Sequence, residues 1–244
     1  MPSIKREQVH QSAVFVPDYE AILTAYRRYV TEAQDRHKKT DLKKRINTEY
    51  LPSELYHVYD RWQPRDGIDT LFLAESPPWS SVENYFYNEN YEAPDNKKNL
   101  STILFDKLHI EAGTKDDNLT EFMARGFFLS DSVKCVWRKK LATDTPGAGK
   151  KNIPRDLIRL SVYLTLKNEI LSMNPRIIFL LGKTALRAMR YIERFSSALQ
   201  DVSVGDHETV GDTHIIVCAF LSERNLKRYG KDIDLAFREL ESLR

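Results

Sequence analysis

The chain of 244 residues is 41% hydrophobic and 30% charged, with 37 Lys and Arg against 35 Asp and Glu, a formal net charge of +2. This composition is typical of a globular protein and excludes collagen-like and disordered chains. No apolar run reaches the roughly 18–20 residues that a membrane-spanning helix needs, and the first residues lack the apolar stretch of a secretory signal. Two cysteines are too few for a disulfide framework or a four-cysteine metal site. We therefore expect a cytoplasmic protein without a membrane partner.

Residues 1–64 are predicted to form a helical extension that packs on the core. Within residues 18–37 apolar side chains recur at helical spacing, and Asp18 is a candidate cap. The charged stretch at 36–45 is typical of a solvated helix face. A turn sequence at 64–67 separates this extension from the main domain, which we expect to span residues 65–244.

The main domain contains four short apolar runs, at residues 70–74, 126–130, 176–181 and 214–219. Each predicts a strand buried on both faces, because its apolar residues are continuous and do not alternate with polar ones. Helical patterns lie between and after them, at about 100–112, 155–173, 184–191 and 227–243. Strands that alternate with helices predict a three-layer α/β/α sandwich around a central four-stranded parallel sheet.

The loops after these strands should carry the chemistry, because parallel sheets bind ligands at the carboxyl ends of their strands. The first strand ends at Glu75, in a turn stiffened by Pro77 and Pro78, which would hold an acid or a base in place. Glu75 could equally cap the turn or form a salt bridge. The second strand ends at Asp131 and Ser132. Asp131 would lie beside Glu75, although Asp is also a common turn residue.

Aromatic residues follow the first strand: Trp79, Tyr85, Phe86 and Tyr87. A flat substrate would need at least one such ring as a stacking surface. The alternative is that these rings pack beneath the loop.

The positive charge is concentrated in two segments. Seven Lys and Arg lie from Lys134 to Arg155 against one acid, Asp144, and a second basic cluster follows the fourth strand. Both segments are expected at the same end of the sheet. A basic rim around aromatic rings favours a polyanion with flat bases, although scattered solvated lysines are the alternative. The net charge of +2 is therefore no argument against a nucleic-acid partner.

Motifs for metals and nucleophiles are absent from the sequence. The six histidines show no HExxH spacing, the cysteines no CxxC, and the chain has no GxSxG, Walker A or GxGxxG loop. We therefore expect neither a metal ion nor a cofactor.

Four segments in chain order resemble motifs of the uracil-DNA glycosylase superfamily, over about residues 68–243. LFLAESPPW is similar to the first motif, written GEAPG, GxNPG or GQDPYH in different branches, and FLSDSVKCVWRKK to the ITNVVKCRPP stretch of the iron–sulfur branch. NPRIIFLLGKTALRAM resembles the PxxVVxLGxxAxxAL segment and is the most specific match. VCAFLSERNLKRYG falls where the fold places an HPSPRN-type loop, whereas the first 60 residues have no counterpart in the resemblance.

The resemblance implies a DNA glycosylase that flips a nucleotide out of the duplex and hydrolyses its glycosidic bond, which breaks with positive charge on the sugar. It implies catalytic roles for Glu75, in activating water or stabilising the cation, and for Asp131, which falls where uracil-specific members place an Asn. The base-binding residues that it implies are Ser76, Pro77, Trp79, Phe86, Tyr87 and Ser132. The DNA-binding residues are Lys134, Arg138, Lys139, Lys140, Lys183, Ser222, Arg224, Asn225 and Lys227.

The chain also departs from the family motifs. Ser76 stands where Asp or Asn is common, and Phe220 stands where the last motif usually has His. Either the chemistry has moved to Glu75 or activity is lost. Only Cys135 matches an iron–sulfur ligand, so no cluster is expected.

Asp131 bears on the substrate that the resemblance implies. A carboxylate only accepts hydrogen bonds, so it favours a base with an exocyclic amine, as in cytosine. We therefore predict excision of a cytosine-type modified base from DNA by a monomeric, monofunctional glycosylase, since no catalytic lysine is identified beside the pocket. Some superfamily members excise modified phage bases, which makes glucosylated hydroxymethylcytosine a candidate and antiphage defence a role by analogy.

Two other functions stay open. One is a catalytically inactive module of the same fold that binds DNA or a modified base. The other is a hydrolase of a small anionic substrate, which fits the α/β sheet and Glu75 but leaves the basic rim unexplained.

Overall fold

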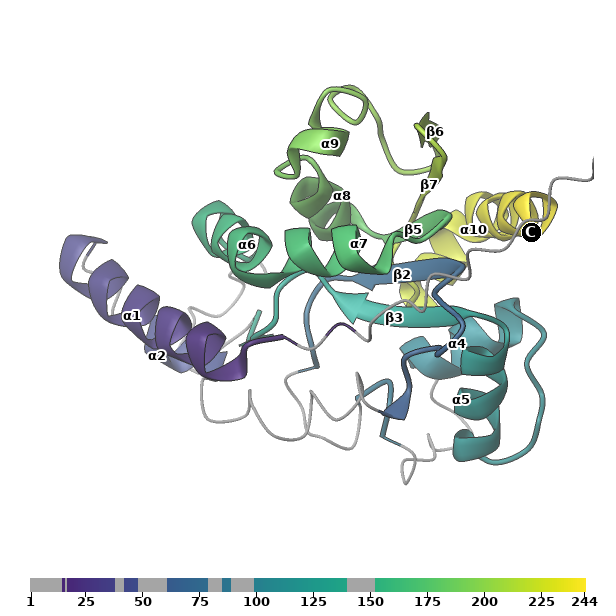
Figure 1. Cartoon of the computed structure of the whole chain (residues 1–244), viewed down its shortest axis with the longest axis horizontal. Coiled ribbons are helices and arrows are strands. Elements are labelled where there is room, and N and C mark those ends of the chain that lie inside the picture. Colours follow the sequence, from purple (N-terminus) through teal and green to yellow (C-terminus); the bar gives the residue numbers. More distant parts are fainter. Residues whose placement is uncertain are drawn as a thin grey trace, which may run out of the picture.

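The computed structural model describes residues 15, 17–37, 42–47, 61–78, 85–88, 99–139 and 152–244. Its centre is a five-stranded sheet with the order β3-β2-β5-β7-β6 (Figure 1). The parallel strands are β2 (Thr70–Ala74), β3 (Phe127–Asp131), β5 (Ile177–Leu181) and β7 (Thr213–Cys218). The four predicted strands are thus confirmed, with ends within one residue of those expected.

The fifth strand, β6 (His207–Val210), pairs antiparallel with β7 at one edge of the sheet. The sequence did not predict it. Its side chains are exposed and half-buried in alternation, as in a short edge strand, so it contains no apolar run. Every residue of β2, β3 and β5 is buried, which explains why those three strands were recognisable.

Helices cover both faces of the sheet, which confirms the α/β/α sandwich (Figure 1). One face carries α6 (Arg155–Ser161), α7 (Lys167–Met173) and α8 (Lys183–Met189). The other carries α4 (Leu100–Lys107), α5 (Lys115–Ala124) and α10 (Glu223–Leu243). On this second face Phe72 and Phe179 from the strands contact Phe122 of α5 and Phe237 of α10, with ring centroids 4.9–5.7 Å apart. A short helix, α9 (Glu193–Ser196), follows α8.

The predicted helices are present, and two others, α5 and the short α9, escaped the sequence pattern. Only Leu119 and Phe122 of α5 are buried, which is too few for a periodic pattern in the sequence. The local sequence signal for this helix is the capping box between Thr114 and Asp117. The helix expected at 155–173 contains a π-helical turn at Val162–Leu166 between α6 and α7. Such a turn shifts the register of the residues that follow it, and Glu169 faces β3 beyond it.

The described part of the N-terminal segment packs on the main domain. It contains α1 (Tyr19–His37), α2 (Leu42–Arg45) and β1 (Ile46–Asn47), which pairs antiparallel with β4 (Val136–Trp137). Tyr26 of α1 is fully buried, and its hydroxyl accepts a hydrogen bond from the Lys134 N–H. The charged stretch at 36–45 is not solvated throughout, because Arg45 is only 1% exposed. The division of the chain at residues 64 and 65 stays a prediction.

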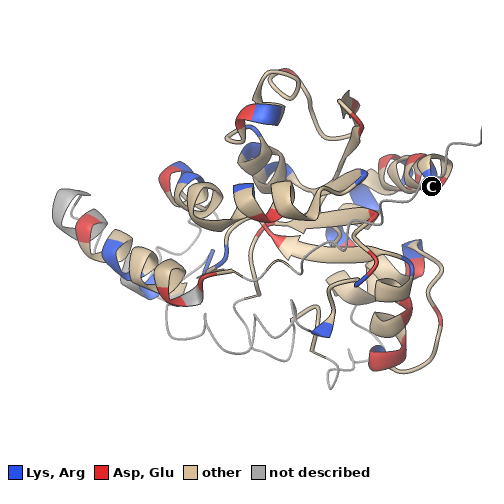
Figure 2. Cartoon of the chain, viewed as in Figure 1, with Lys and Arg blue, Asp and Glu red and all other residues tan. Residues whose placement is uncertain are grey.

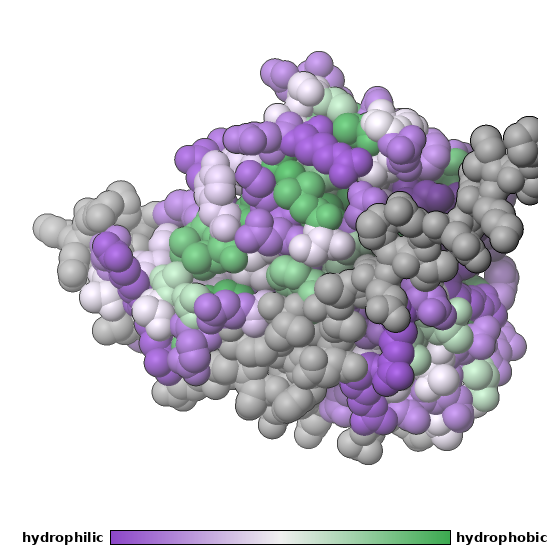
Figure 3. Space-filling view, viewed as in Figure 1, coloured by the Kyte–Doolittle hydropathy of each residue, from purple (hydrophilic) through white to green (hydrophobic). Residues whose placement is uncertain are grey.

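The surface agrees with the charged composition. Figure 2 shows Lys, Arg, Asp and Glu mainly on helices and loops, while the strands of the main sheet carry few of them. Figure 3 shows a mostly hydrophilic face interrupted by small apolar patches. Among the helices of the described ranges, none has the length and apolar character to cross a membrane.

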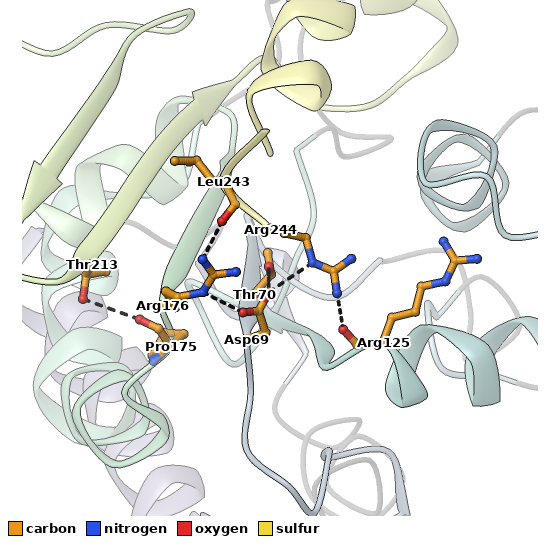
Figure 4. Close-up of polar contacts among 8 residues, drawn as sticks. All are labelled: Asp69, Thr70, Arg125, Pro175, Arg176, Thr213, Leu243 and Arg244. Carbon is orange, nitrogen blue, oxygen red and sulfur yellow. Dashed lines mark hydrogen bonds and ion pairs between the residues drawn. The ribbon is translucent and has the colours of Figure 1, made fainter. Parts of the chain in front are cut away.

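Asp69 joins several chain segments at the amino end of the sheet, opposite the carboxyl ends of the parallel strands (Figure 4). Its carboxylate accepts hydrogen bonds from Arg176 Nε at 2.9 Å and Arg244 Nε at 3.1 Å. The same two arginines donate to the carbonyl oxygens of Leu243 and Arg125. Burial opposes ionisation of Asp69, but the hydrogen bonds from Arg176 and Thr70 and the two positive charges outweigh it and lower its pKa.

We predict that Asp69→Asn lowers the free energy of unfolding by about 1–2 kcal/mol at pH 7, because two charge-assisted hydrogen bonds are weakened. Since the folded-state pKa of Asp69 is lowered, this contribution is complete above the ordinary Asp pKa. It disappears as the pH falls through the folded-state pKa. Urea unfolding of wild type and variant at several pH values measures it, and a difference that does not shrink in acid would contradict this account.

Candidate active site

A pocket of about 450 Å³ opens at the carboxyl ends of β2 and β3, beside the loop that follows β7. Its volume lies within the range of about 300–1,000 Å³ that is common for small-molecule sites. The described residues that line it are Ala74, Glu75, Ser76, Pro77, Pro78, Tyr85, Phe86, Asn99, Leu100, Leu129, Asp131, Trp137, Lys139, Phe220, Leu221 and Ser222. We call this the strand-end pocket.

Glu75 and Asp131 both line the strand-end pocket, because the register of the sheet brings their strands to the same edge. Ala74 pairs with Asp131. The pairing continues beyond the strands, where Ser132 N–H donates to the Ala74 carbonyl at 2.9 Å and Val133 N–H to the Glu75 carbonyl at 3.1 Å. The predicted neighbourhood of the two carboxyl groups is present.

Glu75 combines two of the roles that the sequence left open. Its Oε2 lies 2.5 Å from Nζ of Lys139, so it forms a salt bridge, and it also lines the strand-end pocket. The Glu75 side chain is 16% exposed and that of Lys139 is 43% exposed. The lysine therefore fixes the orientation of a carboxylate that a ligand in the pocket can still reach.

Asp131 is the less solvated of the two acids, with 8% of its surface exposed. Burial raises its pKa to about 7, the negative charges of Glu169 and Glu75 act in the same direction, and the positive charge of Lys134 opposes them. Within the described ranges, no residue forms a hydrogen bond or an ion pair with this carboxyl group. At neutral pH both the protonated and the ionised form of Asp131 are therefore available to a ligand.

A buried ion pair lies close to Asp131. Nζ of Lys134 is 2.6 Å from Oε2 of Glu169, and both side chains are at most 5% exposed. Ser130 Oγ accepts a hydrogen bond from Lys134 and donates one to Glu169 Oε1 at 2.6 Å. Lys134 was predicted as a DNA contact on the rim. The structure corrects this, because the ammonium group is engaged in the interior and does not face solvent.

Four aromatic residues line the strand-end pocket: Tyr85, Phe86, Trp137 and Phe220. Phe86 and Tyr85 belong to the aromatic run expected near the site, and Phe220 is the residue that the motif resemblance puts in place of the family's usual His. The role of Trp137 in lining the pocket was missed, although it directly precedes the basic residues after β4. Asn99 and Leu100, at the start of α4, were also missed because nothing local links them to the strand ends.

Two predicted base-binding residues do not line the strand-end pocket. The Tyr87 hydroxyl donates to the Leu129 carbonyl and accepts from the Leu129 N–H, so it satisfies the backbone of β3. Ser132 is fully buried, and its Oγ donates to the Ala74 carbonyl. Both residues stabilise the strand ends. Ser76 and Pro77 line the pocket as expected, whereas Trp79 lies outside the described residues.

Of the remaining predicted DNA-binding residues, those that the structure describes follow β4, β5 and β7 in the chain. Lys183 and Asn225 line a second cavity of about 630 Å³, together with Arg187 and Arg190. Ser222 lines the strand-end pocket and caps α10. Arg224 and Lys227 are exposed on the first turns of α10, Arg138 is half-buried, and Lys140 lies outside the described residues.

Phe220 lies between the two cavities and lines both. Gly182 lies against it at the end of β5, with a backbone φ of +94°, and a Cβ atom at Gly182 would come within 3.2 Å of the Phe220 Cβ. Only glycine accommodates both the positive φ and this close approach. Gly182 thus lets the loop after β7 close over the ends of the central strands.

The described residues contain no group of His, Cys, Asp and Glu side chains that could hold a metal ion. Cys135 and Cys218 are both free and buried. Burial raises the pKa of both thiols, that of Cys218 to about 12, so neither is poised to act as a thiolate.

The architecture and the pocket define an α/β/α protein whose strand-end pocket is lined by two carboxyl groups and four aromatic side chains. A family model of the uracil DNA glycosylase superfamily matches residues 71–241, and the chain belongs to this superfamily. The superfamily consists in general of DNA glycosylases, hydrolases that remove bases from DNA. A comparison with curated proteins finds none that matches the chain.

We predict that Glu169→Gln destabilises the protein by about 3–5 kcal/mol, because it leaves the buried charge of Lys134 without its counter-ion. The double variant Lys134→Met, Glu169→Leu should lose less stability than Glu169→Gln, since it removes both charges. Chemical unfolding of the three proteins tests this. The exposed pair of Lys227 and Glu223 gives a control, because Lys227→Met should leave stability almost unchanged.

Proposed function

We propose that this protein is a monofunctional DNA glycosylase that flips a cytosine-type modified base into the strand-end pocket and hydrolyses its glycosidic bond, leaving an abasic site. The observation that carries the proposal is that one pocket contains both Glu75, held by Lys139, and the buried Asp131, whose carboxyl has no hydrogen-bond or ion-pair partner among the described residues. We further propose that it acts as a cytoplasmic monomer. Glucosylated hydroxymethylcytosine of phage DNA is the candidate substrate that motivates an antiphage role.

Glu75 is proposed to stabilise the reaction at the sugar. Glycosidic bonds break with positive charge on the sugar, so a fixed carboxylate favours the transition state and can accept a proton from the attacking water. Lys139 holds this carboxylate at the pocket wall. An oriented carboxylate needs no rearrangement during the reaction, which is the source of its catalytic advantage.

Asp131 is proposed to read the edge of the flipped base. A cytosine-type edge offers an amine donor at N4 and an acceptor at N3, whereas a carboxylate can only accept. The protonated form of Asp131 matches both groups, since its carbonyl accepts from N4 and its O–H donates to N3. Its pKa of about 7 makes that form accessible at neutral pH.

The aromatic walls and the basic residues suit the rest of a DNA strand. Phe86, Trp137 and Phe220 offer faces or edges to a flat base. Lys183 and Arg187, on the adjoining cavity, are proposed to contact phosphates next to the flipped nucleotide. These contacts follow the edge of the sheet from one cavity to the other.

One observation favours a second candidate function, a binding module without activity. Phe220 occupies the position of the usual catalytic His, and the described residues that line the strand-end pocket include no histidine. Without an acidic hydrogen-bond donor there, the leaving base receives less stabilisation. A protein that binds modified DNA but releases no base would then result.

We predict that Glu75→Gln lowers the single-turnover excision rate by roughly 10²–10⁴-fold, as for loss of a catalytic acid or base, and changes DNA affinity little. DNA that carries modified cytosines would be incubated with the enzyme and treated with alkali, and released bases would be identified by mass spectrometry. Strand breaks should appear only after alkali. Glu223→Gln, an exposed change on α10, is the matched control, and DNA binding without abasic sites in wild type would favour the binding module.

We predict that Asp131→Asn raises the ratio of uracil to cytosine-type excision about ten- to a hundredfold, because an amide presents its donor to O4 and its acceptor to N3–H. Wild-type excision of cytosine-type bases should decline as the pH rises through about 7, where Asp131 loses its proton. The amide does not titrate, so this decline should be absent from the variant. An unchanged base preference would remove Asp131 from recognition.

A further inference from the structure

Arg45 is a buried arginine in the N-terminal segment, outside the part of the chain that matches the superfamily. It is 1% exposed and is among the largest fully buried side chains. A buried guanidinium is costly unless its donors find acceptors. Its Nη1 donates to the carbonyl oxygens of Arg138 at 3.1 Å and of Lys139 at 3.3 Å.

The backbone of residues 45–47 also pairs with the chain that leads to Lys139, at residues 136–138. In the small sheet Ile46 pairs with Trp137 and Asn47 with Val136. The pairing continues where the Arg138 N–H donates to the Arg45 carbonyl at 2.8 Å. Strand pairing thus fixes the chain up to Arg138, and the Arg45 side chain fixes the next carbonyl, that of Lys139.

Lys139 is the residue whose ammonium reaches Glu75 in the strand-end pocket. Its side chain is long and 43% exposed, so in isolation such an ion pair would be weak and poorly oriented. A lysine whose main chain is already fixed has less conformational freedom to lose when its ammonium binds a carboxylate. The fixed backbone at residues 138 and 139 therefore decides how well Glu75 is held.

We propose that Arg45 is a positioning residue of the active site. It fixes the main chain of Lys139, Lys139 fixes Glu75, and the N-terminal segment in this way completes a pocket built by the superfamily domain. The consequence for catalysis rests on the proposed glycosylase function. The effect on Lys139 does not depend on that function.

The test compares full-length wild type with Arg45→Met and Arg45→Lys. The rate at which an amine-reactive reagent modifies each lysine is measured by peptide mass spectrometry under native conditions. Lys139 should react several-fold faster in Arg45→Met, because its ion pair with Glu75 loosens. Lys107, the last residue of α4, is paired with Asp234 at 2.6 Å and does not line the strand-end pocket, so it should react at an unchanged rate. Arg45→Lys retains the positive charge but not the planar guanidinium, so it should increase the reactivity of Lys139 in the same direction by a smaller factor. This variant carries the test if Arg45→Met folds poorly.

The second measurement is the single-turnover excision rate, in a double-mutant cycle with Lys139→Met. We expect Arg45→Met to lower this rate roughly ten- to a hundredfold with little effect on DNA affinity. It should add almost nothing in the Lys139→Met background, because both changes act through one ion pair. A merely structural role for Arg45 would lower the rate equally in both backgrounds and would overturn the proposal.

The outcomes separate the two claims. Unchanged reactivity of Lys139 in both Arg45 variants overturns the positioning role, whatever the activity. Faster modification of Lys139 with an unchanged excision rate overturns its importance for catalysis. If wild type releases no base from any tested DNA, the proposed function fails, and selective modification of Lys139 still supports the positioning role.

Discussion

The parallel pairing of β2 with β3 is the constraint on which the site depends. Because Ala74 lies opposite Asp131, the two strands deliver Glu75 and Asp131 to one partly desolvated edge. Bringing carboxylates together away from water is unfavourable unless positive charges lie close by or one group takes up a proton. Two lysines supply the charges, and each is engaged with a different acid: Lys139 with Glu75 and Lys134 with Glu169. Asp131 is the acid left with a pKa near 7.

This division of charge gives the two acids of the pocket different chemical properties. Glu75 is oriented by a lysine and is suited to stabilising positive charge. Asp131 can exist with or without its proton near pH 7, and is suited to exchanging hydrogen bonds with a polar ring. The different surroundings of these two neighbouring carboxyl groups give them different properties. The buried partner Glu169 also explains why the Lys134 side chain lies in the interior and not on the rim of the pocket.

At both ends of the sheet, arginine side chains join segments that are far apart in the chain. At the amino end of the sheet Asp69 joins Arg176 and Arg244, which are distant in sequence. At the carboxyl end Arg45 joins the N-terminal segment to the loop after β4. The strands supply a rigid frame between them, and the loops that form the strand-end pocket are held by these polar contacts and by the close approach of Gly182 to Phe220.

The sequence alone determined the α/β/α architecture, the four parallel strands and the placement of Glu75 and Asp131 at neighbouring strand ends. Continuous apolar runs and their order are local signals, and parallel pairing follows from them. Only the tertiary structure decided which side chains face the pocket. Tyr87 and Ser132 bond to partners 42 and 58 residues away, and Lys134 pairs in the interior with Glu169 of α7. Trp137 enters the pocket wall on a strand that pairs with β1. The short strand β6 and the helix α5 lack the buried periodicity that a sequence pattern needs. Burial, ion pairing and the protonation of Asp131 depend on residues that meet only in the folded chain, which is why no local pattern could reveal them.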